Sequence, residues 1–126
     1  MGAVLDASAL LALINGEAGG ERVADALPGA CISAVNWSEV AGKLVDRGVP
    51  EADVDSHLGG LEIDVIGFDR TFALAAAALR RLVPRSLSLG DRACLALGVA
   101  TGATVLTADS HWRVVQVEGV TIVTIR

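Results

Sequence analysis

The sequence predicts an α/β fold in which a central, mainly parallel sheet is flanked by helices. Short apolar or β-branched runs alternate along the chain with longer stretches in which apolar residues recur at helical spacing. Turn signals such as Asn15-Gly16 and Pro28-Gly29 separate these segments. Strands that alternate with helices favour a parallel sheet. The 126 residues, 52% of them hydrophobic, suffice for one core, so residues 1–126 are expected to form a single domain.

The individual elements follow from the same pattern. We expect four strands, at residues 3–5, 30–32, 63–66 and 103–106. We expect six helices, at residues 8–15, 20–27, 35–47, 51–61, 70–83 and 88–101. Gly42 and Gly98 are expected to weaken the helices that contain them. After a turn around residues 110–112, segments 114–117 and 120–125 are expected to be short edge strands.

Charge, hydropathy and cysteine content exclude several classes of protein. A net charge of −5 argues against a protein that coats nucleic acid by bulk electrostatics, so any RNA contact must be local. No apolar run approaches the roughly 18 residues of a membrane-spanning helix, and the N-terminus lacks signal-peptide features. We therefore expect a soluble, cytoplasmic protein without a membrane partner. Cys31 and Cys94 lack metal-site spacing, and we expect buried free thiols.

Four carboxylates stand at boundaries between the predicted elements. Asp6 follows the first strand, and Asp109 follows the fourth. Glu39 lies early in the helix after the second strand, and Asp91 lies early in the helix at 88–101. Each position also has a structural interpretation. Asp6 suits a helix cap, and Asp109 suits a turn. The other two fit the capping-box patterns Asn36-x-x-Glu39 and Ser88-x-x-Asp91.

The topology of a parallel sheet favours a shared site for these acids. The carboxyl ends of the strands and the amino ends of the following helices meet at one edge, where ligands bind. Asp91 reaches this edge only if segment 87–90 carries the chain back across the sheet. Two unit charges about 4 Å apart repel by roughly 4 kcal/mol at an effective dielectric constant of 20, so four carboxylates need cations or protons. Helix N-termini favour the ionised forms of Glu39 and Asp91, which points to Mg²⁺ or Mn²⁺.

Four segments of the chain together resemble the PIN domain, and more narrowly the VapC toxins of bacterial toxin–antitoxin systems. They are Val4-Leu5-Asp6-Ala7-Ser8-Ala9-Leu10, Ile32-Ser33-Ala34-Val35-Asn36-Trp37-Ser38-Glu39-Val40, Leu87-Ser88-Leu89-Gly90-Asp91-Arg92-Ala93 and Val105-Leu106-Thr107-Ala108-Asp109. The resemblance implies a three-layer, Rossmann-like α/β/α fold and an endoribonuclease whose four acids hold Mg²⁺ or Mn²⁺. It also implies a homodimer and a partner antitoxin that blocks the site.

Several neutral and basic residues accompany the four acids. The resemblance places Ser8, Asn36 and Thr107 where such proteins keep small polar residues near the metals, although each also suits a helix terminus or a strand end. Arg92 and Arg113 are expected to contact RNA phosphate because they lie close in sequence to two of the acids, although Arg92 can instead pair with a neighbouring carboxylate. A two-metal mechanism would leave a 3′-hydroxyl and a 5′-phosphate.

Other functional classes fit the sequence less well. No histidine or cysteine pair has the spacing of a zinc site. A response-regulator receiver domain needs an acidic pair after the first strand and a late lysine, but the only lysine is Lys43. A haloacid-dehalogenase-type phosphatase needs a second aspartate where Ser8 stands. The remaining alternative is a PIN-like domain that binds RNA or a partner without a toxin role.

Overall fold

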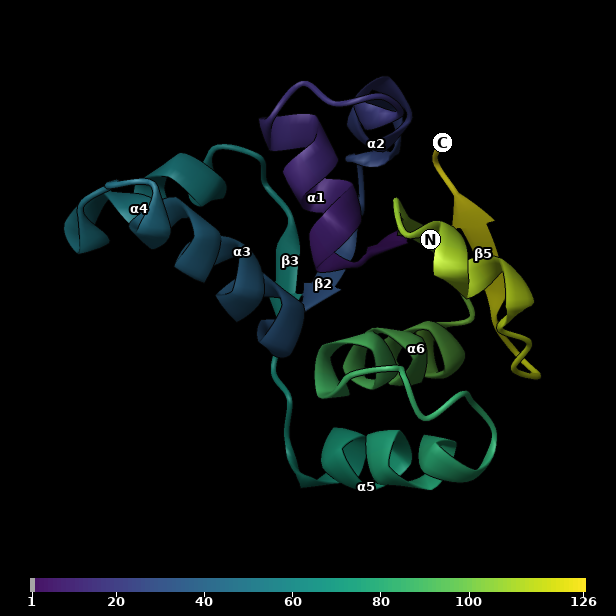
Figure 1. Ribbon diagram of the computed structural model, residues 1–126. Helices are drawn as coiled ribbons and strands as arrows, with labels where there is room; N and C mark the ends of the chain where they lie inside the picture. Colours follow the sequence, from purple (N-terminus) through teal and green to yellow (C-terminus); the bar gives the residue numbers. More distant parts are fainter. Residues whose placement is uncertain (1) are drawn as a thin grey trace.

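A five-stranded parallel sheet lies between two layers of helices in the computed structural model, which describes residues 2–126 (Figure 1). The strands are β1 (Val4–Leu5), β2 (Cys31–Ser33), β3 (Asp64–Ile66), β4 (Thr104–Thr107) and β5 (Thr121–Thr124). Their order across the sheet is β3-β2-β1-β4-β5, and every adjacent pair is parallel. This arrangement confirms the α/β/α fold, the four expected strands and an edge strand within 120–125.

All six expected helices are present, with ends that differ from the expected ones by a few residues. They are α1 (Ala7–Ile14), α2 (Gly20–Ala26), α3 (Ala34–Asp46), α4 (Glu51–Gly59), α5 (Arg70–Ala78) and α6 (Leu89–Thr101). Two 3-10 helices, η1 (Leu79–Arg81) and η2 (Ser110–Val114), follow α5 and β4.

The prediction of a strand at residues 114–117 is wrong. The Asp109 carboxylate caps η2 by accepting a hydrogen bond from the backbone of His111, and this turn takes up the chain directly after β4. The side chain of Trp112 is buried within the turn, whereas Val114 is 77% exposed. Burial of the indole therefore favours the turn over the strand that the β-branched residues suggested.

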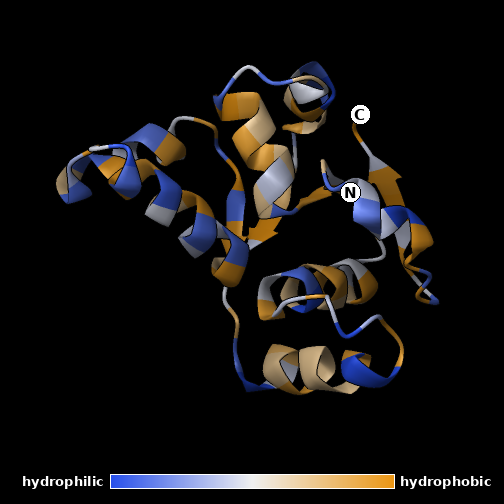
Figure 2. Cartoon of the chain, in the orientation of Figure 1, coloured by the Kyte–Doolittle hydropathy of each residue, from blue (hydrophilic) through white to orange (hydrophobic). Residues whose placement is uncertain are grey.

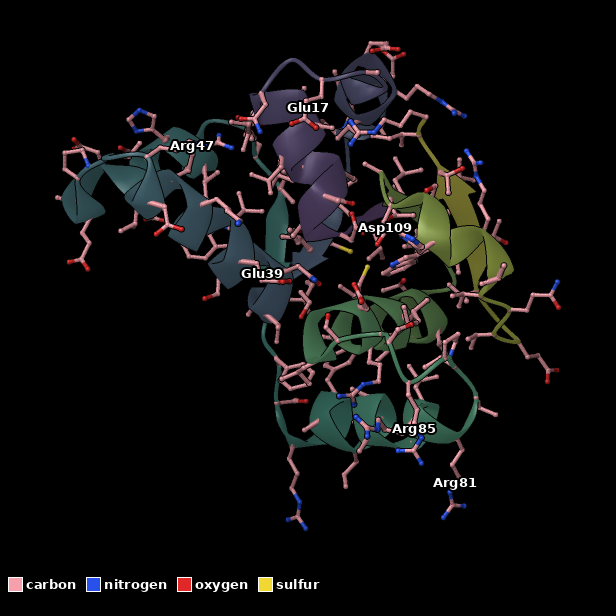
Figure 3. The ribbon with its side chains drawn as sticks, in the orientation of Figure 1. Glu17, Glu39, Arg47, Arg81, Arg85 and Asp109 are labelled. Carbon is pink, nitrogen blue, oxygen red and sulfur yellow. The ribbon has the colours of Figure 1, made fainter. Side chains whose placement is uncertain are left out.

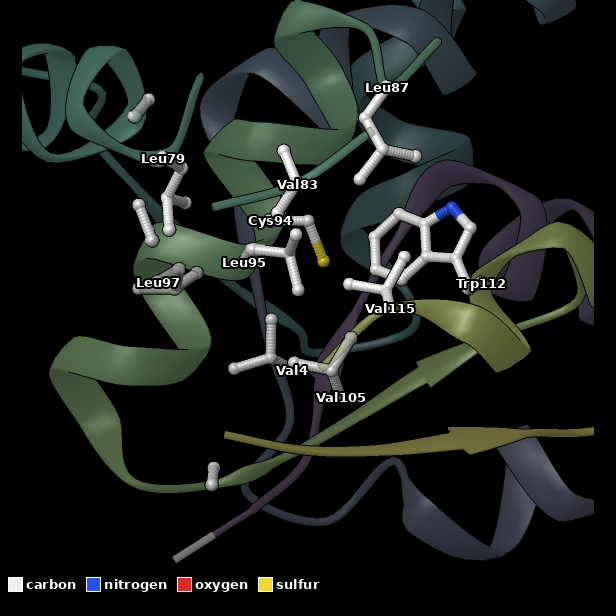
Figure 4. Packing of buried hydrophobic residues seen from close by; sticks show 13 residues of the cluster. Val4, Leu79, Val83, Leu87, Cys94, Leu95, Leu97, Val105, Trp112 and Val115 are labelled. Atoms are coloured by element: carbon white, nitrogen blue, oxygen red, sulfur yellow. The ribbon is translucent and has the colours of Figure 1, made fainter. Parts of the chain in front are cut away.

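The two residues of β1 face opposite layers of helices. Val4 packs with Leu95 of α6 and with Trp112 (Figure 4). Leu5 packs on the other face, with residues of α1 and α2 that include Val23. Both strand residues are fully buried, and burial of an aliphatic side chain of this size contributes about 1.5–3 kcal/mol to folding. The central strand is thereby fixed from both sides.

The helices α3 and α4 pack beside α1 through a third cluster, which includes Leu10, Val40 and Leu58. Figure 2 shows hydrophilic and hydrophobic residues alternating along both helices, as expected for helices with one buried face. No helix in the described part of the chain has the length and apolar character needed to cross a membrane. Both cysteines are free thiols, but only Cys94 is buried as expected, whereas Cys31 is partly exposed.

Candidate functional site

The four acids identified in the sequence line a single cavity of about 230 Å³. Its other lining residues are Ala7, Ser8, Leu11, Asn36 and Lys43. Figure 3 shows Glu39 near the start of α3 and Asp109 just before η2 on opposite sides of this space. Asp91 also lines the cavity, so the segment before α6 does carry the chain back to the edge of the sheet where β1 ends.

Asp6 is the most deeply buried of the four acids, with 4% of its surface exposed. Its carboxylate caps α1, accepting hydrogen bonds from the Ala9 backbone N–H at 2.8 Å and from Ser8 Oγ at 2.7 Å. The hydroxyl of Thr107 donates to the second carboxylate oxygen. Burial raises the pKa of Asp6 to about 6, although these three hydrogen bonds act in the opposite direction. Asp6 forms no ion pair within the described residues.

The hydroxyl groups of Ser8 and Thr107 connect the segment that follows β1 with the segment that follows β4. Ser8 Oγ accepts a hydrogen bond from the Ala108 backbone at 2.9 Å, and Thr107 Oγ1 accepts one from the Asp109 backbone at 3.1 Å. Both hydroxyls also donate to the carboxylate of Asp6. The backbone that carries Asp109 is therefore held in place relative to Asp6.

Asn36 holds Glu39 and connects α3 with α6. Its Nδ2 donates to Glu39 Oε1 and to the carbonyl oxygen of Gly90, both at 3.0 Å. The helix cap suggested for Asn36 is wrong, because Ser33 caps α3 by accepting a hydrogen bond from the Val35 backbone. Asn36 is buried, and its Oδ1 has no hydrogen-bond partner among the described residues. The cavity is thus bordered by an unpaired buried oxygen next to Glu39.

Asp91 and Asp109 act as local caps in this structure. Ser88 and Asp91 form the expected capping box, in which Asp91 Oδ2 accepts a hydrogen bond from the Ser88 backbone at 2.9 Å. Asp109 Oδ1 lies 2.9 Å from both the backbone nitrogen and the Nδ1 atom of His111. The structural and functional interpretations of these acids are therefore compatible, because the same side chains cap helices and line the cavity.

The donor set suits a hard divalent cation. All four acids offer carboxylate oxygens, the ligands that Mg²⁺ and Mn²⁺ favour, and Asp6 is a buried carboxyl group without a cationic partner among the described residues. Within residues 2–126, no three acidic, histidine or cysteine side chains stand close enough to hold a metal ion in their present rotamers. Local hydrogen bonds turn Glu39, Asp91 and Asp109 toward their own helices, yet each keeps one oxygen without a hydrogen bond to a described residue.

The two arginines expected to contact RNA occupy different environments. Arg92 does not line the cavity, because its guanidinium donates to the carbonyl oxygen of Ala76 on α5 and its Nε is buried. Arg113 lines a neighbouring groove of about 640 Å³ that shares Ser8 and Asp109 with the carboxylate cavity.

Sequence reasoning missed Lys43, which lines the carboxylate cavity itself. The sequence does indicate that Lys43 lies on the same helix face as Glu39, because it follows Glu39 by four positions.

Comparison with known proteins agrees with this fold. The family model of the PIN domain matches residues 3–118. The chain therefore belongs to the PIN domain family, which confirms the resemblance found in the sequence. Two curated relatives are VapC ribonuclease Mb2780c of Mycobacterium bovis and Ribonuclease VapC42 of Mycobacterium tuberculosis. Each is 31% identical to this chain over 115 residues, covering 82% of the chain and 87% of the relative.

Solved structures share the whole fold. A toxin–antitoxin complex from Klebsiella pneumoniae matches with a TM-score of 0.76 and 21% identity, covering 98% of both chains. A DNA-bound VapBC complex from Salmonella typhimurium matches with a TM-score of 0.74 and 16% identity, covering 100% of this chain and 99% of the other. At these identities the likeness concerns the fold alone.

Proposed function

We propose that this protein is a divalent-metal-dependent endoribonuclease and a VapC-like toxin. The observation that carries the proposal is the meeting of Asp6, Glu39, Asp91 and Asp109 in one cavity, although they come from four separate segments of a PIN domain. Relatives that are VapC ribonucleases support RNA as the substrate.

The four acids would hold Mg²⁺ or Mn²⁺. A cation in such a site supplies positive charge that activates a water molecule and stabilises the leaving oxygen. The protein's own contribution is position: Ser8 and Thr107 fix Asp6, and Asn36 fixes Glu39. Without a cation, four carboxylates would repel the phosphates of RNA, so the proposal requires the metal for binding as well as for cleavage.

Arg113 is the better placed of the two arginines to hold RNA. It lies at the groove that adjoins the carboxylate cavity, and its guanidinium donates to the backbone oxygen of Arg126 in the same groove. His111 also lines this groove and is largely exposed. We propose that the RNA backbone leaves the cavity along this groove, since cationic and donor side chains there face solvent.

A cognate antitoxin and a second copy of the chain are the proposed protein partners. The antitoxin is supported by structural neighbours that are toxin–antitoxin complexes. Exposed apolar side chains on and around α5 and α6, among them Leu74, Leu82 and Leu89, support a homodimer. Light scattering of the protein, alone and with the antitoxin, tests both associations.

Cleavage assays on carboxylate variants test the enzymatic proposal. Asp6→Asn and Asp91→Asn should lower the RNA cleavage rate with Mg²⁺ or Mn²⁺ by about 100-fold or more, because each removes an anionic metal ligand. Asp69→Asn is the matched control, since Asp69 caps α5 away from the cavity by accepting a hydrogen bond from the Phe72 backbone. EDTA should abolish cleavage by the wild type. A folded Asp91→Asn variant that cleaves RNA at the wild-type rate would refute the proposal.

Expression in a bacterial host tests the toxin role separately. The wild type should arrest growth by cutting RNA in the cytoplasm, the location expected from the sequence, and co-expressed antitoxin should restore growth. The Asp91→Asn variant should leave growth unaffected. A protein that cleaves RNA in vitro but does not arrest growth would instead be an endoribonuclease without a toxin role.

A further inference from the structure

Lys43 places a positive charge at the carboxylate cavity. Among the residues described, it is the basic side chain that lines this cavity with the four acids. It lies on α3 one turn after Glu39, and positions four apart share a helix face. The side chain is exposed, and within residues 2–126 its ammonium group forms no ion pair. Lys43 is therefore available to an external anion.

The other basic side chains have different surroundings. Arg92 is held against α5 by Ala76, and Arg126 bonds to Glu17. Figure 3 shows Arg81 and Arg85 beside the end of α5, away from Glu39 and Asp109. On α3 itself, Arg47 follows Lys43 by four positions, but its guanidinium contacts the Asn15 side chain outside the cavity.

Neutralisation of the neighbouring carboxylates does not explain why Lys43 stands at the cavity. An exposed ammonium group gains little from a carboxylate because water and salt screen the attraction, and no carboxylate of the described chain lies within ion-pair distance of it. A flexible, strongly hydrated ammonium group is instead well suited to phosphate oxygens, which it meets as a point charge. Two divalent cations would only balance the four carboxylates, so a phosphodiester in the cavity would still benefit from a further positive charge.

We propose that Lys43 binds a non-bridging oxygen of an RNA phosphate at the cavity, on the α3 side. This inference rests on the proposed ribonuclease function and extends it by naming a substrate contact. The groove with Arg113 opens on the opposite side, where η2 lies across the cavity from α3 (Figure 3). The RNA backbone then has a cationic contact on each side of the acids, and Lys43 holds it without regard to base sequence.

Binding measurements on three variants test this contact. Lys43→Met removes the charge and keeps the length of the side chain, Lys43→Arg keeps the charge, and Arg47→Met removes a charge one turn farther along α3. Fluorescence anisotropy with a labelled single-stranded RNA is measured in Ca²⁺ over a range of salt concentrations, and gels confirm that the RNA stays intact. Lys43→Met should weaken binding about tenfold and reduce the slope of log K against log[salt] by about 0.7. Lys43→Arg should restore most of the affinity, and Arg47→Met should match the wild type.

The outcomes separate this inference from the function on which it rests. If the wild type cleaves RNA and Lys43→Met binds with the wild-type affinity and salt slope, the Lys43 contact is refuted and the ribonuclease function stands. A fall in melting temperature of Lys43→Met without a change in RNA binding would also refute the contact and would assign the lysine a structural role. Absence of metal-dependent cleavage by the wild type would refute the ribonuclease function itself.

Discussion

The carboxylate of Glu39 fills the space that a side chain at Gly90 would occupy. A Cβ atom added to Gly90 would lie 2.9 Å from the carboxylate carbon of Glu39 and 3.1 Å from its Oε2, closer than side chains pack. Asn36 joins the same two residues through its amide group. The position of one candidate metal ligand on α3 thus depends on the absence of a side chain on α6.

Gly90→Ala should therefore disturb the site more than the fold. We expect little change in the free energy of unfolding, because the added methyl group meets only the end of the flexible, exposed Glu39 side chain, which can move aside. The stabilisation of the protein by Mg²⁺ should fall, because the Glu39 carboxylate is displaced. Gly42→Ala is the matched control, since a Cβ atom added to Gly42 on α3 would meet nothing within 4 Å, and it should gain about 0.5–1 kcal/mol. Urea titrations with and without Mg²⁺ measure both variants; a Gly90→Ala variant that Mg²⁺ stabilises as much as the wild type would contradict the displacement of Glu39.

Asp6 should make the metal-free protein less stable as the pH rises. Burial raises its pKa from 3.8 to about 6, so the folded state binds more protons than the unfolded state between these values. Stability should fall as the pH rises from about 4 to about 6, by up to about 3 kcal/mol in total. Unfolding in EDTA across this range measures the effect. Asp6→Asn should flatten the profile and be more stable than the wild type at pH 8; an unchanged profile would exclude Asp6 as its source.

Addition of Mg²⁺ should offset, at neutral pH, the loss of stability that ionisation of Asp6 causes. A cation that binds the ionised Asp6 carboxylate stabilises the folded state, by about 2.7 kcal/mol when its concentration is 100 times the Kd. Thermal unfolding with increasing Mg²⁺ measures this shift. Asp69→Asn should respond as the wild type does, whereas Asp6→Asn should respond much less. Equal responses from both variants would place the cation elsewhere.

Thr107→Val should destabilise the protein more at pH 8 than at pH 4. The change keeps the shape of the side chain but removes the donor to Asp6 and the acceptor for the Asp109 backbone. We expect a loss of about 1–3 kcal/mol at pH 8, because a buried carboxylate then lacks one of its donors. Thr124→Val on the edge strand β5 is the control, and its hydroxyl has no hydrogen bond among the described residues. Denaturant unfolding of both variants at the two pH values provides the measurement.

The fold is predictable because its information is local. Hydrophobic spacing and turn residues indicate the strands and helices, and their alternation indicates the parallel sheet. Segment 114–117 is the exception, because its β-branched residues favour a strand while the burial of Trp112 decides the outcome. Helix propensity makes Gly98 a weak point of α6. However, a Cβ atom there would lie 2.6 Å from Val105 and 2.8 Å from Val120, so glycine is required for α6 to approach the sheet.

The candidate site is predictable only in part. Asp6, Glu39 and Asp109 come soon after strands. The topology of a parallel sheet therefore predicts that they lie at the same edge of the sheet. The bond from Asn36 to the Gly90 backbone joins residues 54 positions apart, and no local pattern encodes such a contact. The helical spacing of Lys43 and Glu39 predicts a shared face, but whether that face borders the cavity depends on how α3 packs against α1 and α6.

The strand order has a consequence for the protein's synthesis. β4 lies between β1 and β5, so the strand that supplies Thr107 and leads to Asp109 is inserted beside a strand made about a hundred residues earlier. A ribosome makes the segment carrying Asp6 before the segment carrying Asp109. The nascent chain therefore has no complete set of acids until the segment that follows β4 has left the exit tunnel. The cognate antitoxin that we propose, if present during translation, would then meet the protein as its site first forms.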